Sequence, residues 1–319
     1  MTAAHGIESA VEWLRRQGHH LVLSDSACWY DAAPRVFQAF PHHPVINPPE
    51  DELRLIFKKT RALALRYSAP LDSPVGKLSY HVVYNKPTYG FEQVTRQTRQ
   101  NIRKGLEHAT YEPVSFTRLA NEGWALRRET LARQGRHRAE NEAWWKRLCL
   151  SAAGLPGFEA LGAFREGKLL GAIIAYLARG HFLLLYQQSL TEHLKHGVNN
   201  ALGFVFTQKA LSRPDVSELF YGFESLDASW QVDEFKLRMG YTPEPVRQRV
   251  LFHPVLHPLA RPATLAAMEY LVHKGAAGPR WLKATGMMRF YLEGKLPVRQ
   301  QSWPPCLVER TEDLSEKTS

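Results

Sequence analysis

The sequence has few cysteines and no spacing typical of metal or redox ligands. Its 319 residues include three cysteines, which lie far apart and are odd in number: Cys28, Cys149 and Cys306. They argue against a disulfide framework and favour a reducing compartment. No His-Glu-x-x-His or Cys-x-x-Cys motif occurs, and Pro254 keeps His253 and His257 from sharing one helical face. We therefore expect no metal cofactor.

Long hydrophobic runs are also missing. The most apolar stretch, residues 169–190, is interrupted by Arg179-Gly180-His181, and each side is too short to span a bilayer. The first six residues lack the basic and apolar regions of a signal peptide. We therefore predict a cytoplasmic protein without a transmembrane segment.

Motifs of several enzyme classes are absent. The chain has no P-loop, no Rossmann glycine fingerprint and no Gly-x-Ser-x-Gly elbow. Its 44% hydrophobic content is ordinary for one large or two smaller globular domains. Lys and Arg number 41 against 31 Asp and Glu, and the net charge of +10 indicates an anionic partner: a phosphate, a nucleotide, a nucleic acid or a membrane surface.

Local patterns predict an α/β protein with many short elements. Three strand runs over 158–164, 169–177 and 181–188 are separated by glycine turns, which predicts an antiparallel meander. We also predict an ordered loop over 28–50 and a polar tail beyond Val298. The other predicted helices and strands important here are helices over 89–109, 197–211 and 263–274, and strands over 218–223 and 246–252.

Four features in this order resemble a known fold. They are the basic helix 96–106, the meander turn 166–172, the polar loop from Tyr186 to Ala201, and the ending Phe235-Lys236-x-x-x-Gly240-Tyr241. Over roughly residues 90–253 the chain resembles the GNAT acyltransferases, and most closely their Fem-type branch. The resemblance implies a GNAT-like mixed sheet flanked by helices, in one copy or in two tandem halves. We expect a degenerate half over 1–88, a catalytic domain over 89–253, and a helical extension and tail over 254–319.

The polar loop lies where GNAT enzymes bind the pyrophosphate of coenzyme A with backbone N–H groups and a helix N-terminus. The GNAT loop pattern is not met, because Leu194 and Asn199 occupy positions that the pattern reserves for other residues. A capped helix without a ligand is therefore the alternative. The resemblance implies acyl-CoA, first of all acetyl-CoA, as co-substrate, bound by Gln187, Gln188, Lys195, His196, Gly197, Val198, Asn199 and Asn200.

Two residues are candidates for the acyl-transfer chemistry itself. Glu224 follows a predicted strand, where a carboxylate can serve as the base for an amine. Lys236 stands where GNAT proteins have a tyrosine, and Fem-type proteins have a lysine there, preceded by phenylalanine as with Phe235. Such a lysine would stabilise a tetrahedral intermediate. The alternatives are a salt-bridged loop residue for Glu224, a solvent-facing lysine, and a core position for Phe235.

A basic stripe is the candidate for acceptor binding. Arg96, Arg99 and Arg103 share one helical face, and no acidic residue occurs from 93 to 106. Paired guanidinium donors can hold phosphates, although a solvated helix face is the alternative. A second face of this helix, which includes Ile102 and Leu106, is predicted to be buried.

Aromatic residues complete the set of predicted ligand contacts. Tyr186 ends an apolar strand run, so we expect its side chain to reach the cleft with that of Phe235. A second basic cluster over 133–138 precedes two tryptophans and would clamp a nucleotide or sugar, or form a solvated turn.

These observations predict an N-acyltransferase that moves an acyl group from acyl-CoA to an amine of a large or anionic acceptor, either a small molecule or a polymer. A Fem-type transferase that uses aminoacyl-tRNA is the alternative, and tRNA is then the partner. The absence of a 40-residue heptad arm keeps coenzyme A ahead. The rival from another class is a non-catalytic GNAT-like binding protein. Residues 263–296 would contact a membrane surface or pack on the domain.

Overall fold

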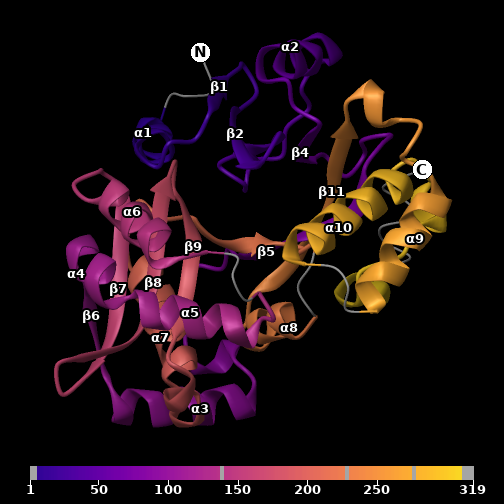
Figure 1. Cartoon of the computed structure of the whole chain (residues 1–319). Coiled ribbons are helices and arrows are strands. Elements are labelled where there is room, and N and C mark those ends of the chain that lie inside the picture. Colours follow the sequence, from indigo (N-terminus) through magenta and orange to yellow (C-terminus); the bar gives the residue numbers. More distant parts are fainter. Residues whose placement is uncertain (1–5, 137–139, 227–229, 275–277, 311–319) are drawn as a thin grey trace.

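A single mixed sheet organises the chain. The computed structural model describes residues 6–136, 140–226, 230–274 and 278–310 (Figure 1). Within these residues, eleven strands form one sheet in the order β1-β2-β3-β4-β11-β5-β10-β9-β8-β7-β6. Helices flank the sheet, which confirms the predicted α/β class.

The strands and helices have the following bounds. The strands are β1 Leu21–Leu23, β2 Cys28–Ala33, β3 Val36–Phe40, β4 Ala64–Ala69, β5 Lys77–Tyr84, β6 Thr110–Pro113, β7 Phe158–Arg165, β8 Lys168–Ala178, β9 His181–Ser189, β10 Glu218–Phe223 and β11 Thr242–Phe252. The helices are α1 Glu8–Arg16, α2 Glu50–Thr60, α3 Arg96–His108, α4 Phe116–Glu122, α5 Trp124–Arg133, α6 Glu142–Ala152, α7 Val198–Leu211, α8 Trp230–Arg238, α9 Pro262–His273 and α10 Pro279–Glu293.

The predicted meander is confirmed. β7, β8 and β9 pair in antiparallel order, and two-residue turns connect them. Both residues of each turn, Glu166-Gly167 and Arg179-Gly180, have positive φ angles. Such turns match the right-handed twist of the paired strands, which explains why the local sequence was sufficient to predict them.

The same topology occurs twice in the sheet. The N-terminal unit consists of β1, β2, β3, α2 and β4, and the C-terminal unit consists of β7, β8, β9, α7 and β10. In each unit an antiparallel meander leads through a helix into a parallel strand: β3 pairs with β4, and β9 with β10. β5 and β11 lie between the two units and join them. The domain boundaries remain a prediction, although this repeat is what two GNAT-like halves would produce.

Two local predictions were wrong. Residues 28–40, expected to be loop, form the β2–β3 hairpin, in which Trp29 and Phe37 are buried. The basic helix begins at Arg96 rather than 89, because the Thr95 side chain accepts a hydrogen bond from the Thr98 backbone N–H and caps it.

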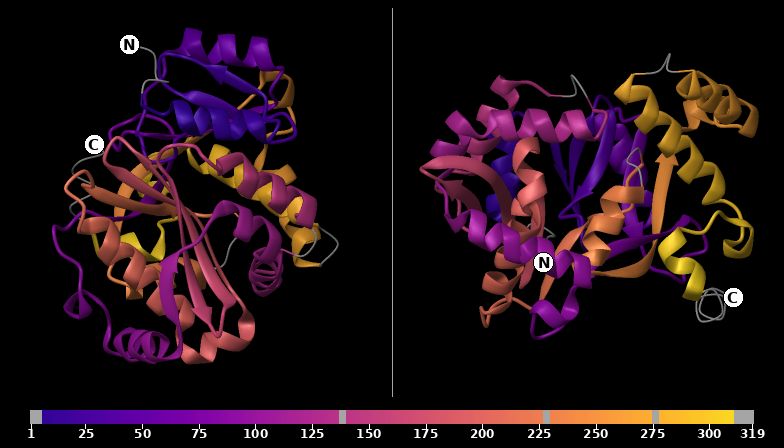
Figure 2. Two further views of the ribbon diagram at one scale, coloured as in Figure 1. Left: turned by 90° about the vertical axis from the view of Figure 1, so that its left-hand side faces the viewer. Right: turned by 90° about the horizontal axis from the view of Figure 1, so that it is seen from below.

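Helices cover both faces of the C-terminal half of the sheet (Figure 2). α3 and α7 pack on one face, where Ile102 and Leu202 are fully buried. α1, α4 and α6 pack on the other face, around Trp145. Leu106 was expected to be buried with Ile102 but is exposed, because α3 turns Gly105 instead toward α7.

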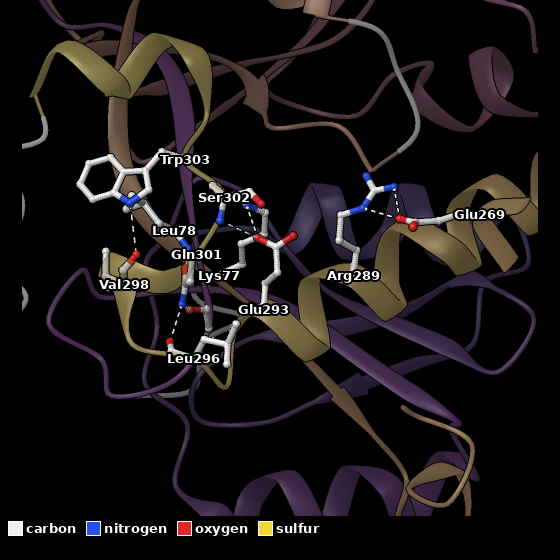
Figure 3. Close-up of polar contacts among 11 residues, drawn as sticks. Lys77, Leu78, Glu269, Arg289, Glu293, Leu296, Val298, Gln301, Ser302 and Trp303 are labelled. Carbon is white, nitrogen blue, oxygen red and sulfur yellow. Dashed lines mark hydrogen bonds and ion pairs between the residues drawn. The ribbon is translucent and has the colours of Figure 1, made fainter. Parts of the chain in front are cut away.

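The C-terminal segment forms a helical hairpin at the outer edge of the molecule, next to β11 (Figures 1 and 2). Residues 298–310, expected to be a polar tail, pack on the core instead, since Val298 and Leu307 are buried. Gln301 fixes this segment by accepting from the Leu78 N–H at 2.6 Å and donating to Leu296 O at 2.8 Å (Figure 3). No helix in the described ranges is long and apolar enough to cross a bilayer.

Candidate active site

A cleft lies where two parallel strands of the C-terminal unit separate. β9 and β10 pair over three residues each, His181–Leu183 with Glu218–Phe220, and the pairing ends there. A cavity of about 560 Å³ lies beside this point. Its walls come from both units, from α8 and from α10, and include Trp13, Tyr30, Phe40, His42, Arg66, Trp144, Leu184, Tyr186, Tyr221, Phe223, Ser225, Asp233, Lys236, Lys283 and Met287.

α8 places a buried ion pair in this cleft. Lys236 Nζ lies 2.7 Å from Asp233 Oδ1, three residues earlier on the helix, and both side chains are buried. The other oxygen of Asp233 accepts a hydrogen bond from Tyr80 Oη at 2.7 Å. Burial raises the pKa of Tyr80 and the adjacent carboxylate raises it further, so the phenol remains a donor. Lys236 is therefore a cleft residue, and the solvent-facing alternative was wrong.

The Lys236 ammonium group lies beside an irregular point of β10. The Lys236 Nζ atom lies 5.3 Å from the centre of the Tyr221 ring. The next residue, Gly222, has a φ angle of +133° at a shift in the β10 register, and a Cβ atom there would lie 3.6 Å from Nζ. Glycine thus permits the local backbone conformation, while the 3.6 Å distance is an ordinary van der Waals contact.

The end of α8 explains the Phe-Lys-x-x-x-Gly-aromatic motif. Gly240 has a φ angle of +89°, and the Tyr241 N–H donates to Lys236 O at 3.3 Å. A Cβ atom at Gly240 would lie 2.5 Å from Gln93 O, so a side chain is excluded on steric grounds as well. Phe235 packs against the core and is not among the cleft-lining residues. The alternative interpretation, in which Phe235 is a core residue, describes its position better.

A network of polar side chains links β10 to β9 on the face of the sheet that α7 covers. Tyr221 Oη donates a hydrogen bond to Gln187 Oε1. Gln187 Nε2 in turn donates to the backbone oxygen of Asn199 at 2.9 Å and to its Oδ1 at 3.1 Å. Burial raises the pKa of Tyr221 well above its ordinary value. The network thus joins β9, β10 and the first turn of α7.

The predicted coenzyme A loop is packed closely by α3. A Cβ atom at Gly197 would lie 1.9 Å from Asn101 O, and one at Gly105 would lie 2.6 Å from the Ala201 Cβ. Val198 is fully buried and Asn200 Nδ2 lies 3.7 Å from Met239 Sδ. The backbone around Gly197 is therefore covered on one side.

Comparisons with known proteins give the fold. No protein-family model matches the chain, and no curated protein is similar to it in sequence. Its structure is similar to that of FemX, with a TM-score of 0.55 and 10% identity over 79% of this chain and 93% of that one. The chain has a Fem-type, GNAT-like fold. Also similar is the C-terminal domain (DUF2156) of a putative lysylphosphatidylglycerol synthetase from Agrobacterium fabrum, with a TM-score of 0.51 and 12% identity over 85% and 96% of the two chains.

The remaining residues predicted to bind the donor lie at different places in the Fem-type fold. Tyr186 lines the cleft, with its ring centre 4.9 Å from the guanidinium carbon of Arg127, which a half-buried bidentate ion pair joins to Glu140. Gln188 is fully buried outside the cleft lining, and its amide has no hydrogen-bond partner within the described part of the chain. Lys195 is exposed, and the His196 ring stacks on His108 at 4.1 Å.

Glu224 is not salt-bridged, but it does not face the cleft. Its Oε2 is buried without a hydrogen-bond partner, and no ion pair connects it to any described residue. Burial raises its pKa, although Lys77 opposes this shift. The residues on either side, Phe223 and Ser225, line the cleft, whereas Glu224 does not. Its role as a base remains a prediction.

The structure does not bring the arginine stripe to the cleft. Arg96 and Arg103 are exposed on α3, Arg99 is half-buried, and none of them is a lining residue. Arg103 instead lies over the Phe91 ring, 5.4 Å from its centre. A part in acceptor binding therefore remains a prediction for a surface away from Lys236.

The residues of the second basic cluster, 133–138, lie at different places. Arg133 donates to Thr191 Oγ1 at 2.7 Å and helps to fix the start of the polar loop. Arg136 lines the cleft. His137 and Arg138 lie outside the described residues. No group of three or more His, Cys, Asp or Glu side chains in the described ranges is arranged to hold a metal ion.

Sequence reasoning missed three residues that line or support the cleft. Asp233 had a usable signal, because a carboxylate three residues before a helical lysine lies on the same face. Tyr80 and Arg66 had none, since β5 and β4 reach the site through tertiary packing. Arg66 is buried and donates to Glu224 O at 3.2 Å, and its guanidinium lies 4.4 Å from the centre of the Phe223 ring.

Proposed function

We propose that this protein transfers an acyl group to an amine in the cleft between β9 and β10. One observation carries the proposal: a lysine and an aspartate form a buried ion pair that lines a large cavity in a Fem-type fold. Burying two charges costs free energy that an apolar pair of similar volume would not. Such an arrangement is typical of a site that must stabilise charge during a reaction.

Lys236 would act on the acyl carbonyl. As the amine nitrogen attacks, a bond forms to the carbonyl carbon and negative charge develops on its oxygen. The Lys236 ammonium group would stabilise this charge inside the cleft. Asp233 and Tyr80 would hold the lysine in position.

The proton of the attacking amine needs an acceptor. We retain Glu224 in this role, acting through a water molecule, because it lies between two cleft residues, Phe223 and Ser225. The bond from the carbonyl carbon to the donor then breaks. The leaving group, a thiolate or a ribose oxygen, takes up a proton.

Two donors remain in the proposal. Acyl-CoA is the donor implied by the GNAT resemblance. An aminoacyl ester of tRNA is favoured by two contacts: α3 covers the backbone at Gly197, and Tyr221 meets Gln187 between the separating strands, where a pantetheine arm would pass. A fold neighbour bears the name lysylphosphatidylglycerol synthetase, which also points to an aminoacyl group. Of the two, the geometry supports the aminoacyl donor better.

The donor can be tested directly. Thermal melting is measured with acetyl-CoA, and label transfer is measured from 14C-aminoacyl-tRNA to a panel of primary amines, including phosphatidylethanolamine in vesicles. A ligand that binds the native state raises the melting temperature. We expect label transfer from aminoacyl-tRNA and no shift with acetyl-CoA. A shift and transfer with acetyl-CoA would assign the coenzyme instead, and failure of both donors would favour a non-catalytic binding protein.

A further inference from the structure

Helix α9 is apolar on both of its faces although it lies on the surface. None of its residues is buried. Its outward face consists of Ala263, Ala266, Ala267, Tyr270, Leu271 and then Lys274, all exposed. Its inner face, with Leu265, Met268 and Val272, is half-buried against α10. A helix that is apolar all round is normally covered by protein or by lipid.

Exposed apolar side chains gather in this part of the molecule. The described residues include twelve large hydrophobic side chains that are exposed. Six of these lie in the short segment 254–296: Val255, Leu259, Tyr270, Leu271, Trp281 and Leu296. Tyr270 and Trp281 have exposed fractions of 61% and 51%. Tyrosine and tryptophan are the residues that favour the interface between water and lipid.

Basic residues outnumber acidic ones on this segment, and both acidic residues are ion-paired. Its acidic residues are Glu269 and Glu293, and both face other protein groups. Glu269 Oε1 lies 2.8 Å from Arg289 Nη2, and Glu293 Oε2 lies 3.1 Å from Lys77 Nζ (Figure 3). By contrast, four described basic residues on or beside the hairpin are exposed: Arg261, Lys274, Lys283 and Lys295.

We propose that the α9–α10 hairpin is a docking surface for an anionic phospholipid membrane. Tyr270, Leu271 and Trp281 would enter the boundary between headgroups and acyl chains, and the basic residues would contact lipid phosphates. A second copy of the chain is the less suitable cover, because two proteins of charge +10 that present basic hairpins repel each other.

The hairpin is connected firmly to the cleft. Lys283 and Met287 on α10 line the cavity that contains Lys236. Between them, Gly286 lies so close to the loop after β10 that a Cβ atom would be 2.3 Å from Leu226 O. A docked hairpin therefore holds the cleft near the lipid surface. This consequence, an acceptor presented at the membrane, rests on the proposed function, whereas the docking itself does not.

Co-sedimentation with vesicles tests the docking. One set of vesicles contains phosphatidylglycerol and phosphatidylcholine, and the other contains phosphatidylcholine alone. We expect the full chain to bind the anionic set and not the neutral one, and to bind less as salt is raised. Leu271→Asp should weaken binding about tenfold or more, and Lys274→Gln about fivefold.

Two controls make the result specific. Leu150→Asp changes an equally exposed leucine on α6, 47% against 43%, and should leave vesicle binding unchanged. The double variant Lys236→Met/Asp233→Leu, in which both charges of the cleft pair are removed, should also bind vesicles like the parent chain, so a failure of the proposed function would not be mistaken for a failure of docking. Circular dichroism confirms that each variant is folded.

Three outcomes would overturn the proposal. One is equal sedimentation with neutral and anionic vesicles, and another is equal loss of binding in Leu150→Asp and Leu271→Asp. The third is a dimer in analytical ultracentrifugation that Leu271→Asp dissociates, without vesicle binding by the parent chain. That result would assign the apolar face to a second copy.

Discussion

The two units of the sheet share a topology but differ at the helix that joins their parallel strands. The first turn of α2 carries three carboxylates, from Glu50, Asp51 and Glu52. The first turn of α7 carries no acidic residue. Carboxylates at a helix N-terminus stabilise the helix, and they also repel a phosphate from the same N–H groups. The N-terminal unit is thus unsuited to an anionic donor at this position.

The units also differ in what lies beyond their parallel pairs. In the C-terminal unit the strands separate beside Lys236 and Tyr221. The N-terminal unit supplies Arg66, Phe40 and His42 as a wall of that same cavity. The comparison indicates that one copy carries the chemistry and the other shapes the pocket.

The largest expected effect comes from breaking the ion pair that α8 places beside the C-terminal unit. Lys236→Met leaves the Asp233 carboxylate buried without its cation, and we expect a loss of about 3–5 kcal/mol in the free energy of unfolding. The double variant Lys236→Met/Asp233→Leu should recover part of this loss, because both charges are gone while the Tyr80 hydroxyl loses its acceptor. Urea denaturation measures all three proteins. Equal instability of the double variant would show that the pair is not the cause.

The next largest effect concerns Gly197, at the start of α7, where the two units differ. Gly197→Ala should destabilise the protein by about 2–4 kcal/mol, because it adds overpacking against Asn101 to the strain of a positive φ angle. Gly154→Ala is the matched control, since its φ angle of +74° is nearly that of Gly197 and open space surrounds it. It should cost about 1 kcal/mol. Equal costs in urea denaturation would mean that α3 does not restrict the loop.

A smaller effect concerns acid stability of the N-terminal unit. Burial lowers the pKa of His42 to about 4 and that of His43 to about 3. The unfolded chain therefore binds more protons below about pH 6.5, and stability should fall from there toward pH 4. His43→Phe removes a buried Nδ1 without a partner and should flatten this fall.

The matched control for His43→Phe is His273→Phe, at an exposed position on α9. Thermal melting at several pH values between 4 and 7 compares both variants with the parent chain. Identical acid limbs in the parent and His43→Phe would exclude His43 as a source of the pH dependence.

The smallest effect concerns Glu224, whose pKa is raised by burial. The folded state keeps its proton to a higher pH than the unfolded state, so this group destabilises the protein as pH rises above the unfolded value. Glu224→Gln should therefore raise the melting temperature at pH 8 and leave it unchanged at pH 4. A lower melting temperature at pH 8 would indicate that the ionised carboxylate stabilises the native state.

Features encoded by neighbouring residues could be predicted from the sequence. The Glu166-Gly167 turn fixed the meander, and the Gly240 ending placed Lys236 on a short helix beside the cleft. The β2–β3 hairpin was missed because it belongs to the longer stretch 28–50, which is rich in proline, aromatic residues and histidine and resembled a loop.

Features set by tertiary packing could not be predicted. The arginines of α3 do share a helical face, but the sequence gives no information about where that face lies relative to the cleft. Arg66 and Tyr80 reach the site from strands more than 140 residues before Lys236 in the chain. Asp233, by contrast, could have been predicted, because its spacing of three residues from Lys236 places both side chains on one face of a helix.

The central claim is that the chemistry takes place at Lys236 of α8, beside the separating strands of the C-terminal unit. The most direct test is the rate of label transfer from 14C-aminoacyl-tRNA, or from acetyl-CoA if that proves to be the donor, by the parent chain, Lys236→Met/Asp233→Leu and Lys146→Met. Lys146 is an exposed lysine on α6 and serves as the matched control. We predict that the double variant loses transfer by about 100-fold or more, while Lys146→Met transfers label like the parent chain. Undiminished transfer by a folded double variant would contradict the account.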